Sequence, residues 1–227
     1  MAEETGRAKA PPRRRLRSLF GFKVFEQFFL AVAPDVTGML VAQGELSVEA
    51  MAAFERWSRG DVAPDGLSGL KDLEQACDDA RRRLMSALRA ALATPINQED
   101  LYVLSERCDR VVNAARDIAA EATDLGWKPD LHAAEMATCL SEGMAEIVRG
   151  FSLLRADPSG ASAAADSAVR HAHRVEHAYR AAMADLLKSP DLLTVFTTRE
   201  IYRRYGRSAE LLTALGDRLW YSVLAEA

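Results

Sequence analysis

The chain contains 227 residues, of which 49% are hydrophobic and 27% charged, and its formal net charge is −4. A chain of this length forms one large domain or two small ones and buries enough surface to fold without a disulfide or a metal. Abundant Ala and Leu beside 13 glycines favour an all-α fold. No run of about 18 uncharged apolar residues occurs, so the sequence predicts no membrane-spanning helix.

The charge is distributed unevenly along the chain. Residues 1–23 carry seven Lys or Arg and two Glu, a net charge of +5, which leaves −9 for the remainder. We predict a basic, flexible N-terminal tail, which either meets an anionic membrane surface or an acidic partner, or serves solubility alone. The apolar run at 28–34 is too short for a cleavable signal peptide and follows charged residues. The acidic remainder argues against general nucleic-acid binding.

Apolar residues recur at steps of three and four in three long segments, which predicts helices packed in a bundle. The stripes are Leu70, Leu73, Cys77, Ala80, Leu84 and Leu88 in 67–92, Leu101, Leu104, Cys108, Val111, Ala115 and Ile118 in 98–122, and Ile201, Tyr205, Ser208, Leu212, Leu215 and Leu219 in 200–224. Turn-forming residues cluster at 59–66, 93–97, 124–130, 155–162 and 187–193. The pattern therefore predicts about six long helices and a short one near 47–57, with Pro34 interrupting or restarting the first.

The turn at 93–97 leads into a helix start. Asn97 is a good N-cap, and Glu99 and Asp100 fall in the first turn, where the helix dipole favours acids. The three cysteines lie within helical patterns and form no CxxC pair, which predicts reduced thiols that pack as small hydrophobic side chains.

The chain also contains an internal duplication, with matching positions separated by 100 to 102 residues. The matched pairs are Glu74 with Glu176, Asp117 with Asp217, and "QEDLY" at 98–102 with "TREIY" at 198–202. We therefore predict two three-helix repeats, residues 24–126 and residues 127–227.

Four polar residues on two neighbouring predicted helices form a candidate metal site. They are Glu74 and Asp78, then Asp109 and Asn113. Each pair is four residues apart on one helix face, and helices joined by a short turn are antiparallel neighbours, so the side-chain oxygens can converge. Such oxygens suit Mg, Mn, Ca or ferric iron. The alternative is a solvated face whose acids pair with Arg81, Arg107 and Arg110 along the helices.

The segment "HRVEH" gives a second candidate. His173, Glu176 and His177 share a helix face and match H-x-x-E-H, the inverted zinc-protease motif in which two His bind zinc and Glu acts as base. No third ligand of that protease class can be placed, so catalysis lacks its structural context. Adventitious zinc or nickel binding and plain surface histidines are the alternatives.

The segment "TPINQEDLYVLSERCDRVVNAA", with the upstream "LEQACDDARRRL" and the late "TREIYRRYGRSAELLTALGD", resembles PhoU-like proteins, in the branch of accessory proteins of Pit-type phosphate transporters. The resemblance covers residues 20–225. It implies tandem three-helix bundles, E(D)-x-x-x-D motifs that bind multinuclear metal clusters, and a cytoplasmic role in regulating phosphate uptake. When the family's motifs are placed on this sequence, Glu74 and Asp78 fill the first motif. Asp109 and Asn113 fill the second, with Asn in place of the usual acid.

The second half departs from this family pattern. Glu176 remains, but Arg180 stands where the partner acid would be, and Gly206 and Glu210 stand at the ends of the other motif. Since a cation repels a metal ion, the resemblance implies Mg, Mn, Zn or Fe ions in the first repeat more than in the second. His173 or His177 would have to serve as ligands there.

Three functions remain open from the sequence. The favoured one is a non-enzymatic cytoplasmic regulator that binds a Pit-type phosphate transporter, at the inner face of the membrane if the basic N-terminus brings it there. The second is a metal-dependent hydrolase that uses the acidic residues or the HxxEH segment. The third is a metal-free helical scaffold that binds another protein. Formation of a homo-oligomer is compatible with each.

Overall fold

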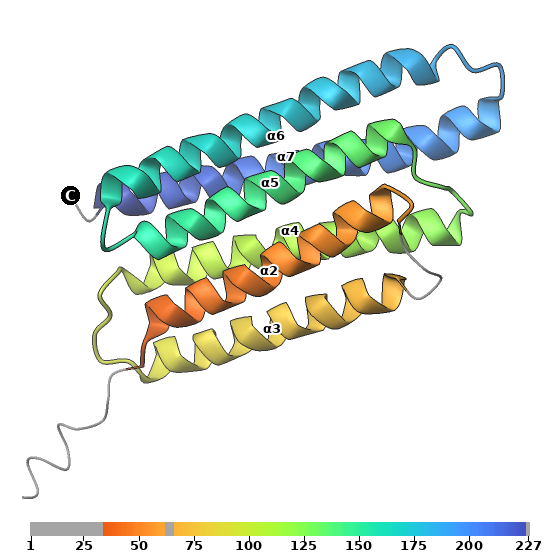
Figure 1. Ribbon diagram of the computed structural model, residues 1–227. Coiled ribbons are helices and arrows are strands. Elements are labelled where there is room, and N and C mark those ends of the chain that lie inside the picture. Colours follow the sequence, from red (N-terminus) through yellow and green to blue (C-terminus); the bar gives the residue numbers. More distant parts are fainter. Residues whose placement is uncertain (1–33, 62–65, 226–227) are drawn as a thin grey trace, which may run out of the picture. The chain divides into compact units, whose positions relative to one another are not determined.

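The computed structural model describes residues 34–61 and 66–225. All regular structure in these residues is helical, in six helices, which confirms the predicted fold class (Figure 1). The helices are α2 (Val36–Ser58), α3 (Gly66–Ala90), α4 (Gln98–Asp124), α5 (Leu131–Leu153), α6 (Pro158–Leu186) and α7 (Leu192–Ala225). None of them combines the length and the apolar character needed to cross a membrane.

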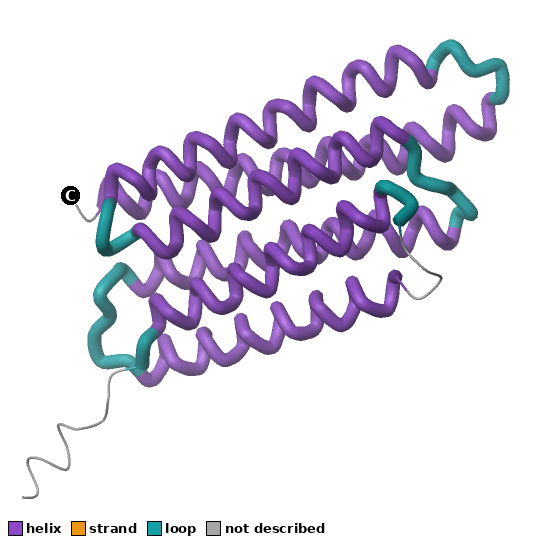
Figure 2. The backbone as a smooth tube through the Cα atoms, in the orientation of Figure 1, coloured by secondary structure: helices purple, strands orange, loops and turns teal. Residues whose placement is uncertain are grey.

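The helices pack in two mutually contacting groups of three. Within α2, α3 and α4 each helix contacts the other two, and the same holds within α5, α6 and α7. Contacts between α2 and α5 and between α4 and α7 join the groups (Figure 2). The proposed repeat boundary after residue 126 separates these two groups and stays a prediction. The predicted tail at 1–23 lies outside the described residues.

The predicted apolar stripes form the core. In α4 and α7 every stripe residue is buried, and in α3 only Leu73 is partly exposed. The separate short helix predicted near 47–57 is wrong, because these residues belong to the continuous helix α2. Gly44 lies inside α2 rather than at a break, and a Cβ there would stand 2.9 Å from Val148 Cγ2 on α5. The glycine therefore allows α2 and α5 to approach closely.

The helix ends follow the capping signals. Asp35 caps α2 directly after Pro34, which confirms that a helix starts there. Asn97 caps α4 as predicted, with its Oδ1 accepting a hydrogen bond from Glu99 N at 2.8 Å. Gly126 has a φ of +62° in the connection between α4 and α5, a conformation that glycine adopts without strain.

The three cysteines pack in the interior as predicted. Cys77, Cys108 and Cys139 are free and buried. Burial raises the pKa of the Cys77 thiol to about 11 and that of the Cys108 thiol to about 12, so both carry their proton at neutral pH.

Candidate functional site

The first candidate lies where α3 packs against α4, and we call Glu74, Asp78, Asp109 and Asn113 the α3–α4 acidic cluster. The structure brings Asp78 and Asp109 together around one guanidinium, that of Arg81. Arg81 Nη2 donates to Asp78 Oδ1 at 3.1 Å, and Arg81 Nε lies 3.5 Å from Asp109 Oδ2. The Nε atom is buried and forms no hydrogen bond, so its link to Asp109 is purely an ion pair.

The remaining members also have nitrogen partners. Glu74 Oε1 accepts a hydrogen bond at 3.1 Å from Arg116 Nη1, which connects α3 to α4 a second time. Arg82 forms a further ion pair with Asp78. Asn113 Nδ2 donates to Asp109 Oδ2 at 2.9 Å, one turn away on α4. Every carboxylate of the α3–α4 acidic cluster therefore faces a guanidinium.

Asp109 is the electrostatically unusual member, with 9% of its surface exposed. Burial raises the pKa of its carboxyl above the ordinary value, and the charges of Asp78 and Glu74 add to the rise. Arg81 and the hydrogen bond from Asn113 oppose it. The charge of Asp109 is thus a cost to the fold that Arg81 partly offsets.

As arranged, these residues do not fit a metal ion. A metal would need carboxylate oxygens directed at a common point, whereas here the guanidinium of Arg81 occupies the space between Asp78 and Asp109. Asn113 presents its NH₂ group, not its oxygen, to the cluster. Across residues 34–61 and 66–225, no three His, Cys, Asp or Glu side chains are placed to hold a metal. Metal binding by the α3–α4 acidic cluster stays a prediction.

The alternative to a metal site, in which arginines along the helices pair with the acids, is supported for two of the three arginines named for it. Arg81 neutralises the cluster, and Arg110 forms an ion pair with Glu106 one turn back on α4. Arg107 behaves differently, because its Nη1 donates to the Ala214 carbonyl oxygen on α7. The pairing of Arg107 within its own helix was therefore wrong, and this side chain joins α4 to α7.

The HxxEH residues lie exposed along α6. His173 borders a groove with Asp217 and Trp220, whereas Glu176 borders a different groove. His177 Nδ1 lies 3.1 Å from Arg180 Nη2, so a cation adjoins the imidazole. Zinc binding by His173, Glu176 and His177 stays a prediction, and nothing in their surroundings favours it.

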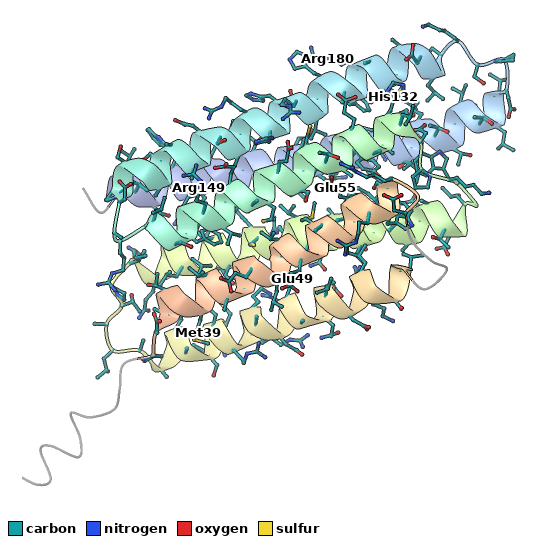
Figure 3. All side chains as sticks on the ribbon, viewed as in Figure 1. Met39, Glu49, Glu55, His132, Arg149 and Arg180 are labelled. Carbon is teal, nitrogen blue, oxygen red and sulfur yellow. The ribbon has the colours of Figure 1, made fainter. Side chains whose placement is uncertain are left out.

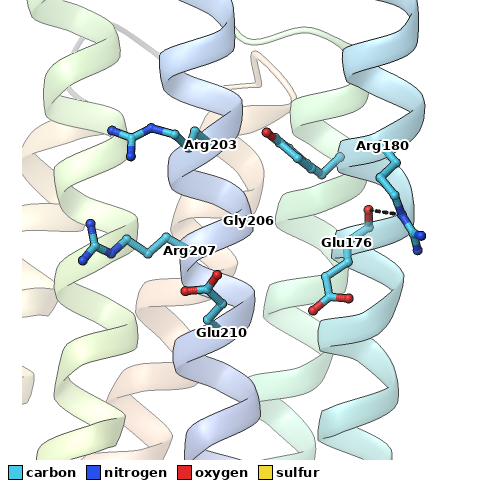
Figure 4. Close-up of a pocket in the computed structure, with 7 residues that line it drawn as sticks. Glu176, Arg180, Arg203, Gly206, Arg207 and Glu210 are labelled. Atoms are coloured by element: carbon cyan, nitrogen blue, oxygen red, sulfur yellow. Dashed lines mark hydrogen bonds between the residues drawn. The ribbon is translucent and has the colours of Figure 1, made fainter.

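The groove beside Glu176 brings together the four positions at which the family pattern would place the two motifs of the second repeat. Glu176, Arg180, Gly206 and Glu210 all line this groove between α6 and α7, which has a volume of about 550 Å³ (Figure 4). Arg203 and Arg207 complete its charged lining. Arg180 lies on α6 with its Nε directed at the Glu176 carbonyl oxygen (Figures 3 and 4). Among the four motif positions, Arg180 therefore stands where the family pattern expects an acid, and Gly206 has no side-chain ligand to offer.

Sequence reasoning missed a buried ion pair between α4 and α7. Asp100, read as a helix-start residue, is 3% exposed and accepts a hydrogen bond from Arg218 Nη2. The available signal was its position, because Asp100 is four residues before Leu104 and so shares the buried face of α4.

Four large apolar side chains are exposed around the connection between α6 and α7. Leu187, Leu192, Leu193 and Phe196 are each 67–74% exposed, and we call them the α6–α7 apolar patch. Two ion pairs lie beside it, Lys188 with Asp185 and Arg203 with Glu200, together with the exposed Asp191 and Arg199. Sequence reasoning treated this segment only as a turn.

No protein-family model and no curated protein sequence matches the chain. Solved structures do match it at low identity. A PhoU-like protein from Shewanella oneidensis MR-1 is 15% identical over 84% of this chain and 100% of its own, with a TM-score of 0.64. The phosphate transport system regulatory protein PhoU from Streptococcus pneumoniae is 14% identical over 82% of this chain and 92% of its own, with a TM-score of 0.66. A PhoU-like phosphate regulatory protein from the same Shewanella strain is 14% identical over 85% of this chain and 100% of its own, with a TM-score of 0.63.

At identities of 14–15%, these structural matches establish the fold and nothing further. They confirm the prediction of a PhoU-like, all-helical architecture. Over the residues that the structure describes, the chain therefore shares its all-helical fold with solved structures of PhoU-like proteins.

Proposed function

We propose that the chain is a cytoplasmic, non-enzymatic regulator of inorganic phosphate uptake that acts by binding a Pit-type phosphate transporter. The observation that carries the proposal is the shared fold with solved structures described as phosphate regulatory proteins. The sequence resemblance at "TPINQEDLYVLSERCD" favours the Pit accessory branch. Binding would change transport by favouring one conformation of the transporter, to the extent that its affinity for the two conformations differs.

The α6–α7 apolar patch supplies a surface for this contact. Burial of one large apolar side chain contributes about 1.5–3 kcal/mol, so four contribute at most about 6–12 kcal/mol. Association itself costs about 4–15 kcal/mol, so the patch suits a reversible contact rather than a permanent one. The patch itself consists of apolar side chains, so the complementary surface on the transporter would be apolar at its centre. The basic residues of 1–23 would add attraction to the anionic membrane surface.

A metal-free helical scaffold that binds another protein is the second candidate function. The arginines that face each carboxylate of the α3–α4 acidic cluster favour it over a metal-dependent role. Bound metal on the purified protein, measured by elemental analysis, separates the two. A stoichiometric transition metal would count against the scaffold, and its absence together with unchanged stability in chelator would support it.

Deletion and complementation test the proposed function. We expect deletion of the gene to change phosphate uptake in cells whose phosphate enters through the Pit-type transporter, and the wild-type chain to restore it. The variant Phe196→Glu should fail to restore it, because a charge in the α6–α7 apolar patch opposes burial. The matched control is Leu92→Glu, an exposed apolar residue in the connection between α3 and α4, at the opposite end of the helices (Figure 2). Unchanged uptake on deletion would refute the proposal.

A further inference from the structure

A groove between α4 and α7 collects arginine side chains from both helices. Its residues recur at steps of three and four, which places each set on one helix face. They are Arg110, Asn113, Ala114 and Asp117 on α4 and Arg204, Arg207 and Leu211 on α7. We call this the α4–α7 groove, and its volume is about 300 Å³.

Positive charge exceeds negative charge in the lining of this groove. Asp117 is the one carboxylate among its described lining residues, against three arginines. Asp117 Oδ1 already accepts hydrogen bonds from Arg116 Nε and Nη2, at 3.1 and 2.6 Å. The charge of Asp117 is therefore largely committed to Arg116 and does not neutralise the arginines of the groove.

One of the three arginines has no partner within residues 34–61 and 66–225. Arg110 forms an ion pair with Glu106, and Arg204 forms one with Glu121. Arg207 is exposed and makes neither a hydrogen bond nor an ion pair with any described residue. Figure 4 shows Arg207 and Arg203 extending from α7 in the same direction, away from Glu176 on α6. The guanidinium of Arg207 is therefore available to a ligand in the groove.

We propose that the α4–α7 groove binds a phosphate-type anion, with Arg207 as its main ligand and Arg110 and Arg204 beside it. The planar guanidinium offers two parallel N–H donors, which match the oxygens of a phosphate group. The groove is at the small end of ligand pockets, which suits inorganic phosphate or the terminal phosphoryl group of a larger molecule. Bound phosphate competes with Glu106 and Glu121 for their arginines, so affinity depends most on Arg207.

The placement of the groove gives binding a structural consequence. One wall belongs to α4 and the other to α7, which form one of the two helix pairs that join the three-helix groups. An anion held by arginines of both helices would strengthen this junction, which is a direct way for phosphate to alter the protein. A role of this binding in phosphate regulation rests on the proposed function, whereas the binding itself requires no transporter.

Isothermal titration of the full chain with inorganic phosphate, and then with pyrophosphate, tests the inference, with chloride as the reference anion at constant ionic strength. We expect saturable binding to the wild type. Arg207→Gln should weaken it about tenfold or more, because a charge-assisted pair of hydrogen bonds is lost. The matched control is Arg149→Gln. Arg149 is an exposed arginine on α5 (Figure 3) that pairs with Glu146 and does not line the groove, so this variant should bind as the wild type does.

A second arm identifies the source of the phosphate group. Flotation with vesicles that contain phosphatidic acid tests a lipid headgroup, and loss of flotation in Arg207→Gln would assign the groove to lipid. Arg207→Lys, which keeps the charge but loses the planar fork, should give intermediate affinity. The inference is overturned if neither free phosphate, pyrophosphate nor the vesicles bind, or if Arg207→Gln binds them as the wild type does. These measurements need no transporter, so failure of the proposed function leaves their outcome unaffected.

Discussion

Replacement of Arg81 by Gln tests whether an arginine, rather than a metal, balances the α3–α4 acidic cluster. The variant removes the guanidinium between Asp78 and Asp109 and leaves a shorter, neutral polar side chain. Asp78 retains its ion pair with Arg82, but Asp109 loses its main compensating charge. The loss of stability should therefore come chiefly from Asp109.

The magnitude follows from how deeply this pair is buried. Removal of one partner of a fully buried pair costs about 3–5 kcal/mol, whereas an exposed pair contributes about 0–1 kcal/mol. The Asp109 side chain is 12% exposed and that of Arg81 is 29% exposed, so solvent screens part of the interaction. We expect Arg81→Gln to lower the free energy of unfolding by about 1–2 kcal/mol at neutral pH.

Urea denaturation followed by circular dichroism measures this loss as a function of pH. The pKa of Asp109 is raised in the folded state, so the folded protein binds its proton more tightly than the unfolded chain does. Protonation stabilises the fold as pH falls from the raised pKa toward the ordinary carboxyl value of 3.8. A protonated Asp109 no longer needs a cation, so the difference between wild type and variant should shrink over the same range.

The matched control is Arg83→Gln, on the exposed side of the same helix, which should change stability by less than about 0.5 kcal/mol. Equal stabilities for Arg81→Gln and the wild type at neutral pH would refute the reasoning. So would a loss of wild-type stability in chelator as large as the loss caused by the variant.

Three further predictions concern the packing of the helices. Gly44→Ala should lower the free energy of unfolding, measured in urea, by about 1–2 kcal/mol, because the added Cβ meets Val148. Gly69 has open space around it, so Gly69→Ala should raise the free energy of unfolding by about 0.5–1 kcal/mol, and destabilisation by both variants would contradict this. Arg218→Gln should cost about 3 kcal/mol by removing the guanidinium that pairs with the buried carboxylate of Asp100, and a cost below about 1 kcal/mol would show that the pair is dispensable. The three thiols should resist alkylation in the native protein and react in urea, and rapid native reaction would contradict their burial.

The helices were predictable because their signals are local. The stripes in α3, α4 and α7 repeat every three or four residues, and Asn97 and Asp35 sit directly before the helices that they cap. The separate short helix near 47–57 was wrong, because α2 runs without a break from Val36 to Ser58. Its Gly44 packs against Val148 on α5, and local patterns carry no information about such a contact.

The candidate site was predictable only in its position. The spacing of Glu74 and Asp78 places both acids on the side of α3 that faces α4, and the structure brings Asp78 and Asp109 together. The spacing is the same whether the charges meet a metal or an arginine, so the sequence left the role of Arg81 open. Contacts such as Asp100 with Arg218, 118 residues apart, depend on which helices become neighbours and have no local signature.

The most direct test of the account is the affinity of the purified chain for a purified Pit-type phosphate transporter in lipid nanodiscs, measured by biolayer interferometry. We predict reversible binding that Phe196→Glu abolishes and Leu92→Glu retains. No binding by the wild type, or equal binding by both variants, would contradict the central claim that the chain regulates phosphate uptake through contact with the transporter.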